Sequence, residues 1–517
     1  MCWNWQTGTF EGRVFYDVRV QVPSLAPNKH DSFDTRVSET IVFLLHGRKN
    51  RKFAVYNLIK LRTTNRNFIN RNEANIMFSN KDLRNLIVPL FIEQFLLMFV
   101  GIADTFVVSF SSEADVSGVS LVTSFNTVLI FLFTALSSGG AVIISQYIGS
   151  KRENMASRSA GQLLMISMVI SVAMTIPILL FRMPLLNLLF GKIEPDVMTA
   201  CETYLFITTL SLPCLAIYDA GTALCRSIGK TNVTMYISIV ANIINVIGNC
   251  ICVFWFRLGV AGVAYPSLLS RVLSAVAVTA FCFHKQNAVR YKLADIFCWD
   301  GALLKKIMGI ALPNGIENGV HQLVKVALSS MVALFGTYQI AANGVAQSIW
   351  SLAAIMGLAM APVYTTVIGQ CMGARDIDAA NFYFKKLNKI TLVLSIIWNA
   401  LIFAITPLIV QYSAISPEAK NLVIWLVLIN NIFNALAYPF AGSLGNGLRA
   451  AGDVKFTMIV SISLTVAARL LFSALFGLLF GWGVIGVAIG MSIDLVFRGA
   501  IFIRRLKSQK WTQFQVI

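Results

Sequence analysis

The chain has 517 residues, of which 56% are hydrophobic and only 13% are charged, against roughly 25% charged in ordinary soluble domains. It carries 42 basic and 24 acidic residues, which give a net charge of +18. This composition excludes an ordinary soluble domain and indicates a protein that lies mostly in a lipid bilayer.

Residues 1–76 do not follow the pattern of the rest. Their best apolar run, Ile41–Leu45, is too short to cross a bilayer. No apolar core of roughly 7–15 residues follows a basic start, as it would in a signal peptide. Met77 begins a stretch that resembles a natural start just before the first long apolar run. We therefore expect residues 1–76 to be a disordered cytoplasmic extension or a mis-assigned start, with a short regulatory extension as the alternative.

Twelve apolar runs follow, each near the roughly 20 residues that a helix needs to cross a bilayer. Lipid cannot satisfy open backbone groups, so each run is expected to be helical. The runs are 84–110, 118–147, 158–181, 197–222, 233–256, 260–284, 304–334, 339–370, 387–411, 419–446, 455–480 and 483–503. The sequence thus predicts an all-α membrane protein of twelve transmembrane helices. Six form an N-lobe over 77–290, and six form a C-lobe over 291–517 that ends in a basic cytoplasmic tail.

The two sets of six runs are copies of one another. A shift of 223 or 224 positions superposes many residues of the first set on like residues of the second. The matched pairs include Pro89 and Pro313, Glu93 and Glu317, Gln146 and Gln370, Gly149 and Gly373, Thr234 and Thr457, and Gly259 and Gly483. Because six is an even number, both copies enter the membrane from the same side, and the repeat is parallel. Internal repeats in a membrane chain are typical of transporters with a site between the copies.

Basic residues gather in the loops of one predicted membrane side. These loops and the C-terminal tail hold most of the lysines and arginines, Arg226 and Arg449 among them. The opposite loops offer only Arg182, Lys192, Arg257 and Lys420. By the positive-inside rule, the crowded side and both termini are cytoplasmic, as expected for a multi-pass protein of the cell membrane. The basic excess is thus mostly explained by topology, and we expect no nucleic-acid partner.

Several short motifs, in order along residues 80–505, point to one family. The stretch Leu86–Gln94, with Asp104 further along the same helix, resembles the first helix of multidrug and toxic compound extrusion (MATE) transporters. Gln146–Gly149 and Gln370–Gly373 resemble the ends of its second and eighth helices, and Phe335–Asn343 resembles the turn between the seventh and eighth. This similarity implies two six-helix lobes around a central cavity, and export of a solute against entry of sodium ions or protons.

Asp104 is the candidate for the group that senses the driving ion. It lies about 30 Å along the first helix at 1.5 Å per residue, and Asn245 and Asn249 reach a similar depth on the fifth. Their i,i+4 spacing places both amides on one helix face. A carboxylate with amide oxygens suits a hard cation, and a desolvated carboxylate could carry a proton instead. The resemblance implies Asn-x-x-x-Asp in the fifth helix, so Asn249 replaces an acid and leaves the ion and its stoichiometry open. The alternative is that Asp104 caps a loop or bonds a neighbouring helix.

Glu93 and Glu317 each follow a helix-interrupting proline by four residues, Pro89 and Pro313 respectively. Their matched positions favour a shared scaffold role, in which each carboxylate satisfies backbone groups that the proline frees. Kinking at these prolines could also serve gating.

The seventh helix carries a polar stripe, because Glu317, His321 and Lys325 follow one another at i,i+4. The outer two are about 12 Å apart along the axis, so His321 could bridge them and relay a proton. Alternatively, the stripe only lines water in the cavity.

Among the remaining intramembrane charges, Asp494 and Arg498 are expected to neutralise each other, and Arg271 and Arg469 are expected to form inter-helix pairs. We expect no cofactor other than the coupling ion.

These features predict a monomeric secondary active efflux transporter, which exports a small organic solute, cationic or amphiphilic, by alternating access. A lipid or oligosaccharide flippase is the first alternative. It would be favoured if two of Lys325, Arg271 and Arg469 faced the central cavity. A membrane-embedded enzyme is less compatible, because the chain has no HExxH motif, acid-rich metal cluster or serine elbow. A channel would not sustain uphill flux.

Overall fold

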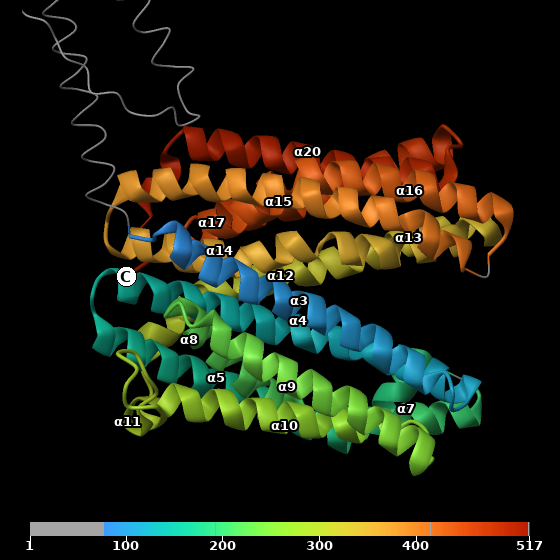
Figure 1. Cartoon of the computed structure of the whole chain (residues 1–517), viewed down its shortest axis with the longest axis horizontal. Coiled ribbons are helices and arrows are strands. Elements are labelled where there is room, and N and C mark those ends of the chain that lie inside the picture. The colour runs from blue at the N-terminus through green and yellow to red at the C-terminus, as the bar shows by residue number, and fades with distance from the viewer. Residues whose placement is uncertain (1–76, 192, 414, 515) are drawn as a thin grey trace, which may run out of the picture. The chain divides into compact units, whose positions relative to one another are not determined.

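The computed structural model describes residues 77–191, 193–413, 415–514 and 516–517. The expectations for residues 1–76 lie outside these ranges. Within the ranges the chain is helical almost throughout and contains no strand (Figure 1). This is the arrangement that lets every backbone group bond internally in lipid.

The first copy contains seven long or medium helices and a short connecting helix α6. Their bounds are α3 Asn80–Val108, α4 Glu113–Gly149, α5 Glu153–Leu180, α6 Arg182–Phe190, α7 Pro195–Leu210, α8 Leu212–Ser227, α9 Thr231–Cys250 and α10 Ala261–Phe283. A π-helical turn, η1 Ile251–Trp255, continues α9. Ser79 begins α3 with a capping box completed by Asp82, and Ser112 caps α4, so these starts are set by local side chains.

The second copy follows the short helix α11 (Leu293–Phe297). Its elements are α12 Gly301–Val332, η2 Ala333–Phe335, α13 Thr337–Ala353, α14 Ile355–Gly373, α15 Ile377–Gln411, α16 Pro417–Leu436, η3 Pro439–Ser443, α17 Leu444–Ala450, α18 Val454–Ser463, η4 Leu464–Arg469, α19 Leu470–Ala474, η5 Leu475–Leu479, α20 Gly483–Lys507 and η6 Lys510–Gln513. Asp300, Asp376 and Ser416 accept backbone hydrogen bonds at the starts of α12, α15 and α16.

The described residues contain ten helices long and apolar enough to cross a membrane, or eleven when α7 and α8, bent by 43°, count as one span. The remaining predicted span corresponds to α12, which is long enough at 32 residues but is interrupted by polar side chains such as Asn314, Glu317 and His321. Each of the twelve predicted runs is helical. The predicted all-α membrane fold with two copies of one unit is confirmed.

The π-helical turn η4 accounts for one change of the repeat shift, from 223 to 224 positions. Thr234 and Thr457 are 223 positions apart, whereas Gly259 and Gly483 are 224 apart. A π turn accommodates one more residue than an α turn. The turns η1 and η5 are themselves 224 positions apart and match, whereas η4 falls where the first copy has the uninterrupted helix α9. The second copy therefore gains its extra residue at η4.

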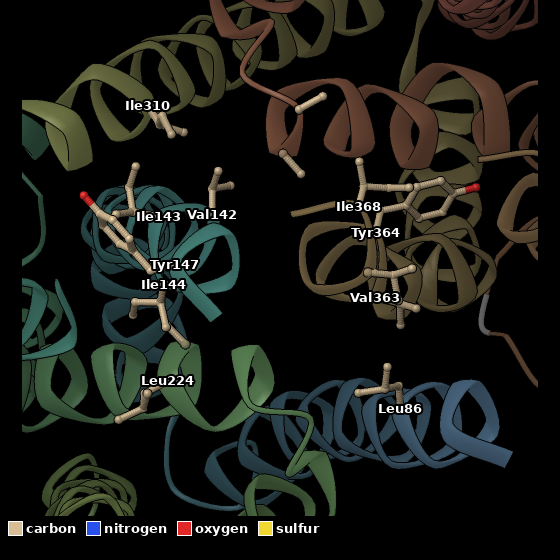
Figure 2. Packing of buried hydrophobic residues seen from close by; sticks show 14 of the residues in the cluster. Leu86, Val142, Ile143, Ile144, Tyr147, Leu224, Ile310, Val363, Tyr364 and Ile368 are labelled. Atoms are coloured by element: carbon tan, nitrogen blue, oxygen red, sulfur yellow. The ribbon is translucent and has the colours of Figure 1, made fainter. Parts of the chain in front are cut away.

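The two lobes share a hydrophobic core at one end only. The largest cluster contains side chains of both copies and lies beside the basic loops. Figure 2 shows part of it: Ile144 of α4 points toward Leu224 of α8, and Val142 of α4 lies on the side of Ile310 of α12. Leu86 of α3 lies beside Val363 of α14. The other two clusters each belong to a single lobe. The lobes are thus joined at the basic end, and their opposite halves have separate cores.

The tightest contact between the lobes involves the matched Gln-x-x-Gly motifs at the ends of α4 and α14. A Cβ atom on Gly149 would lie 2.0 Å from the carbonyl oxygen of Gln370, and one on Gly373 would lie 1.9 Å from that of Gln146. The Gln146 side chain also donates to the Ala450 carbonyl at 2.8 Å. Only glycine permits this approach of the two backbones.

Candidate functional site

The structure brings together Asp104, Asn245 and Asn249, the three residues predicted to sense the driving ion. The Asn249 amide donates to Asp104 Oδ1 at 2.5 Å and to Asn245 Oδ1 at 3.2 Å. Asn245 donates in turn to Ser267 Oγ on α10 at 2.9 Å. This cluster joins α3, α9 and α10, which pack against one another in the N-lobe. Ser267 also belongs to this cluster. The sequence alone does not reveal it, because it lies on a different helix.

The oxygens of this cluster outnumber the donors that bind them. Asn245 and Asn249 are buried, whereas Asp104 is half-buried. The Oδ1 atom of Asn249 is buried and accepts no hydrogen bond from any described residue. An unsatisfied buried acceptor beside a carboxylate is suited to a bound cation or a proton. The bond to Asn249 also fits the alternative role predicted for Asp104, because it joins α3 to the neighbouring helix α9.

The part of α3 that carries Asp104 is open on one side. Leu97, Phe99 and Phe106 are exposed, and a Cβ atom on Gly101 would meet no other atom within 4 Å. Arg271 of α10 donates to Ser211 Oγ at 2.7 Å, so its predicted inter-helix partner is a hydroxyl and not a carboxylate.

Glu93 has a different role from the one expected. Its carboxylate is buried and accepts hydrogen bonds from Arg226 at 2.8 Å, Thr234 at 3.1 Å and Tyr218 at 3.4 Å. The expected bonds to backbone groups freed by Pro89 are thus replaced by side-chain partners from α8 and α9. Glu93 remains a scaffold residue, but it acts by joining three helices.

Glu317 repeats this arrangement in the C-lobe. Arg449 of α17 donates to its Oε1 at 2.5 Å and also to Asn446 at 2.9 Å. Arg226 and Arg449 were expected in cytoplasmic loops, yet both lie within helices and pair with these acids. The Glu-Arg pair is a feature of both copies, and the matched glutamates and arginines of the repeat were the signal that could have revealed it.

The predicted stripe of α12 does not form a connected chain. Glu317 turns to Arg449, while His321 Nε2 lies 3.2 Å from Arg469 Nη1 and its Nδ1 lies 3.5 Å from Thr465 Oγ1. Lys325 is exposed. The proposed relay from Glu317 through His321 to Lys325 is therefore wrong for this conformation, because each residue has separate surroundings.

A second charged cluster lies inside the C-lobe. Asp494 of α20 is fully buried and accepts from Arg498 at 2.8 Å, which confirms the expected neutralising pair. It also accepts from Arg469 through Nε at 3.0 Å and Nη2 at 2.7 Å. Arg498 donates to Thr465 Oγ1 at 2.6 Å as well. The inter-helix pair expected for Arg469 is thus found, with Asp494 as its partner.

Comparison with known proteins agrees with these features. The MatE family profile matches residues 89–251 and 313–475, one match in each copy. An "Uncharacterized transporter YisQ" of Bacillus subtilis is 26% identical over 437 residues, covering 83% of this chain and 95% of that protein. A "Probable multidrug resistance protein NorM" of Thermotoga maritima is 23% identical over 447 residues, covering 84% and 94%.

Solved structures show the same fold. A MATE crystal structure in the straight conformation superposes with a TM-score of 0.77 at 22% identity, over 83% of this chain and 96% of the other. A MOP superfamily transporter from Pyrococcus furiosus superposes with a TM-score of 0.78 at 22% identity, over 83% and 95%. The chain therefore belongs to the MatE family and is a multi-pass membrane transporter of the multidrug efflux type, not an enzyme.

Proposed function

We propose that the protein exports a small amphiphilic organic solute in exchange for an entering sodium ion or proton, by alternating access of its two lobes. The observation that supports this most directly is the Asp104–Asn249 contact, in which a half-buried carboxylate meets a buried amide with one unsatisfied oxygen. Such a group is rare inside a membrane span and is functional by default unless a basic partner neutralises it. No described side chain forms an ion pair with Asp104 within 4 Å.

The arrangement of the cores supports the direction of exchange. The lobes are joined at the basic end and have separate cores at the other end. Under the positive-inside rule the basic end faces the cytoplasm. The conformation is then closed to the cytoplasm, and the Asp104 side of the N-lobe is reachable from outside. A cation that enters the cell has to bind from that side.

Coupling requires only that the cation and the solute prefer different conformations, because a ligand with equal affinity for both shifts nothing. A cation or proton on Asp104 would alter its bond to Asn249 and hence the packing of α3 on α9. One monovalent charge that enters down a potential of about 100 mV releases about 2.3 kcal/mol. That energy sustains about a 50-fold gradient of a neutral solute.

We place the protein in the cell membrane as a monomer with both termini in the cytoplasm. Cys298 is exposed and lies between α10 and α12, at the basic end. A membrane-impermeant maleimide added to intact cells should leave it unlabelled until the membrane is permeabilised. Labelling of Cys298 in intact cells, absent in a Cys298→Ser control, would reverse the orientation.

The transport function is tested with purified protein in liposomes loaded with ethidium. Sodium and proton gradients are imposed separately, and dye movement is followed by fluorescence. We expect the dye to move uphill when a sodium or a proton gradient is imposed. No uphill movement is expected when the sodium and proton concentrations are equal on both sides. Movement that only dissipates the dye gradient would indicate a channel and contradict the proposal.

A further inference from the structure

The C-lobe carries basic side chains where the N-lobe carries its candidate cation site. At the 224-position offset between the two family matches, Asn245 and Asn249 correspond to Arg469 and Ser473, and Asp104 corresponds to Leu328. We propose that the region around Arg469 is a second binding site, which takes an anionic group, a carboxylate or a phosphate ester, of an amphiphilic ligand. This inference rests on the proposed transport function and narrows its substrate class.

The π-helical turn η4 has a direct part in building this site. It contains both Thr465 and Arg469 and packs against α12 and α20. The extra residue of the turn has no equivalent in α9, where the matched segment is regular. Single π turns inside α-helices are frequent at functional sites. Here the turn places the Arg469 guanidinium between Asp494 of α20 and His321 of α12.

The charges of the cluster do not balance. A guanidinium can only donate hydrogen bonds, so His321 Nε2 accepts from Arg469, and the imidazole is neutral. Arg469 and Arg498 are 8% and 7% exposed, and both share the single carboxylate of Asp494. With Lys325 one turn beyond His321 on the same face of α12, three positive groups face one negative group. Uncompensated charge inside a membrane is unfavourable, and an anionic ligand would offset it.

Hydrogen-bond donors also exceed acceptors. Each guanidinium offers five N–H groups, whereas the acceptors bonded to these two are the Asp494 oxygens, His321 Nε2 and Thr465 Oγ1. The Nε atom of Arg498 is buried and has no acceptor among the described residues. A buried donor of this kind calls for an explanation. A carboxylate or phosphate provides the missing acceptors and binds guanidinium groups in the strongest geometry available to them.

The cluster has a graded path from the surface to its interior. Lys325 is exposed, His321 is half-buried, and Arg469 is nearly buried. An anionic group could first meet the Lys325 ammonium group and then approach the guanidinium beneath. The N-lobe has the Asp104 carboxylate and two amides in its candidate cation site, whereas the C-lobe has this cluster with an excess of basic groups. A ligand with an acidic group is therefore preferred to one that bears a positive charge alone.

The test compares two dyes that differ only in the acidic group. Rhodamine B carries a free carboxylate, and its ethyl ester has the same ring system without that negative charge. Binding to the purified protein in neutral detergent is measured by fluorescence anisotropy. We expect the acid to bind about tenfold more tightly than the ester, the size of one charge-assisted contact. Equal affinities, or failure of the acid to bind, would overturn the proposal.

Variants locate the effect without disturbing the buried core. Lys325→Gln should weaken binding of the acid about tenfold and leave the ester unchanged, and Lys325→Arg should keep the preference. Lys455→Gln removes the same charge from an exposed position at the start of α18 in the same lobe and should change neither affinity. If Lys325→Gln bound the acid in preference to the ester as strongly as the unsubstituted protein does, the graded path and the proposed site would both be excluded.

The source of the anionic group is identified in lipid nanodiscs. Displacement of rhodamine B by phosphatidylglycerol, but not by phosphatidylcholine, would identify a phospholipid headgroup, as a flippase requires. Absence of displacement would exclude a phospholipid headgroup and restrict the site to the carboxylate of a soluble solute, for which the preference for rhodamine B over its ester is then the supporting observation. The Asp104 flux experiments are independent of this binding measurement. If the protein showed no preference for the acid but still carried out gradient-driven transport, this inference would be rejected and the proposed transport function would stand.

Discussion

Arg226 of α8 donates at 2.8 Å to the buried carboxylate of Glu93 on α3, and the repeat reproduces this pair as Arg449 and Glu317. The pair joins α3 to α8 in the N-lobe and α12 to α17 in the C-lobe. The Glu93 side chain is 1% exposed and that of Arg226 is 22% exposed. Because two additional hydroxyl groups also donate to Glu93, the carboxylate is well satisfied, and the pair holds α8 against α3.

Replacement of Glu93 by glutamine should therefore destabilise the N-lobe. Arg226 would be left partly buried without its negative partner, and breaking such a pair costs about 3 kcal/mol. The expected result is a lower Tm, measured by intrinsic tryptophan fluorescence of the detergent-solubilised protein. Glu317→Gln should act in the same direction through Arg449.

The double variant Glu93→Gln, Arg226→Gln provides the matched control. It removes the uncompensated charge, so it should unfold at a higher temperature than Glu93→Gln alone. If the double variant were the less stable of the two, Arg226 would have a stabilising role that does not depend on Glu93.

Asp104→Asn should abolish gradient-driven dye efflux, by at least about tenfold, while the protein stays folded and inserted. Asparagine has nearly the same shape and keeps an oxygen for the Asn249 bond, but it cannot balance a cation or take up a proton. The measurement is ethidium efflux in the liposome assay, with Tm recorded in parallel.

Asp115→Asn is the control for this prediction, because Asp115 lies in the first turn of α4 and its backbone is capped by Ser112. Its efflux should resemble that of the unsubstituted protein. Unchanged ethidium export by the Asp104→Asn variant would reject Asp104 as the coupling residue.

The sequence predicted the parts of this molecule that physical chemistry constrains most. Lipid leaves helices as the only spanning element, so the twelve runs were recognisable by length and apolar character. The contact between Asp104 and Asn249 was expected because equal depth on two neighbouring helices follows from helical rise alone. Matched residues in the two copies gave the parallel repeat.

Other features depended on neighbours that a linear sequence does not reveal. Arg226 follows an apolar run, so the sequence alone predicts a loop position, yet its side chain turns back to Glu93. The π turn η4 was not predicted, since a one-residue change in repeat shift does not say where the residue is inserted. Consequently, the sequence alone does not identify the partners of Arg469, and it predicts partners for His321 on its own helix instead of on η4.

Asn249→Asp would add a second acid to the candidate cation site. Two carboxylates in one site repel each other when no cation is bound and attract a monovalent cation more strongly. The variant should have a lower Tm than the unsubstituted protein without sodium and a larger rise in Tm as sodium is added. A Tm with the same sodium dependence as the unsubstituted protein would show that this position does not contact the ion. Asn242→Asp, two turns away on the same helix and half-buried, is the control.

Gly149→Ala should prevent closure of the lobes at the basic end. The added methyl group would lie 2.0 Å from the Gln370 carbonyl oxygen, and neither backbone can move without separating α4 from α14. The equilibrium should therefore shift toward the conformation open at that end, and gradient-driven efflux should fall because transport needs both conformations.

The shift can be measured at Cys371, a fully buried thiol two residues before Gly373 on α14. In a Cys298→Ser background, maleimide labelling of Cys371 should be faster in Gly149→Ala than in the protein with Gly149, as read by peptide mass spectrometry. Gly309→Ala on α12 is the control, because a Cβ there meets no atom within 4 Å and should change neither labelling nor efflux. If Cys371 were labelled at the same rate with Gly149, with Gly149→Ala and with Gly309→Ala, the lobes would tolerate the methyl group. The Gln-x-x-Gly contact would then not control closure.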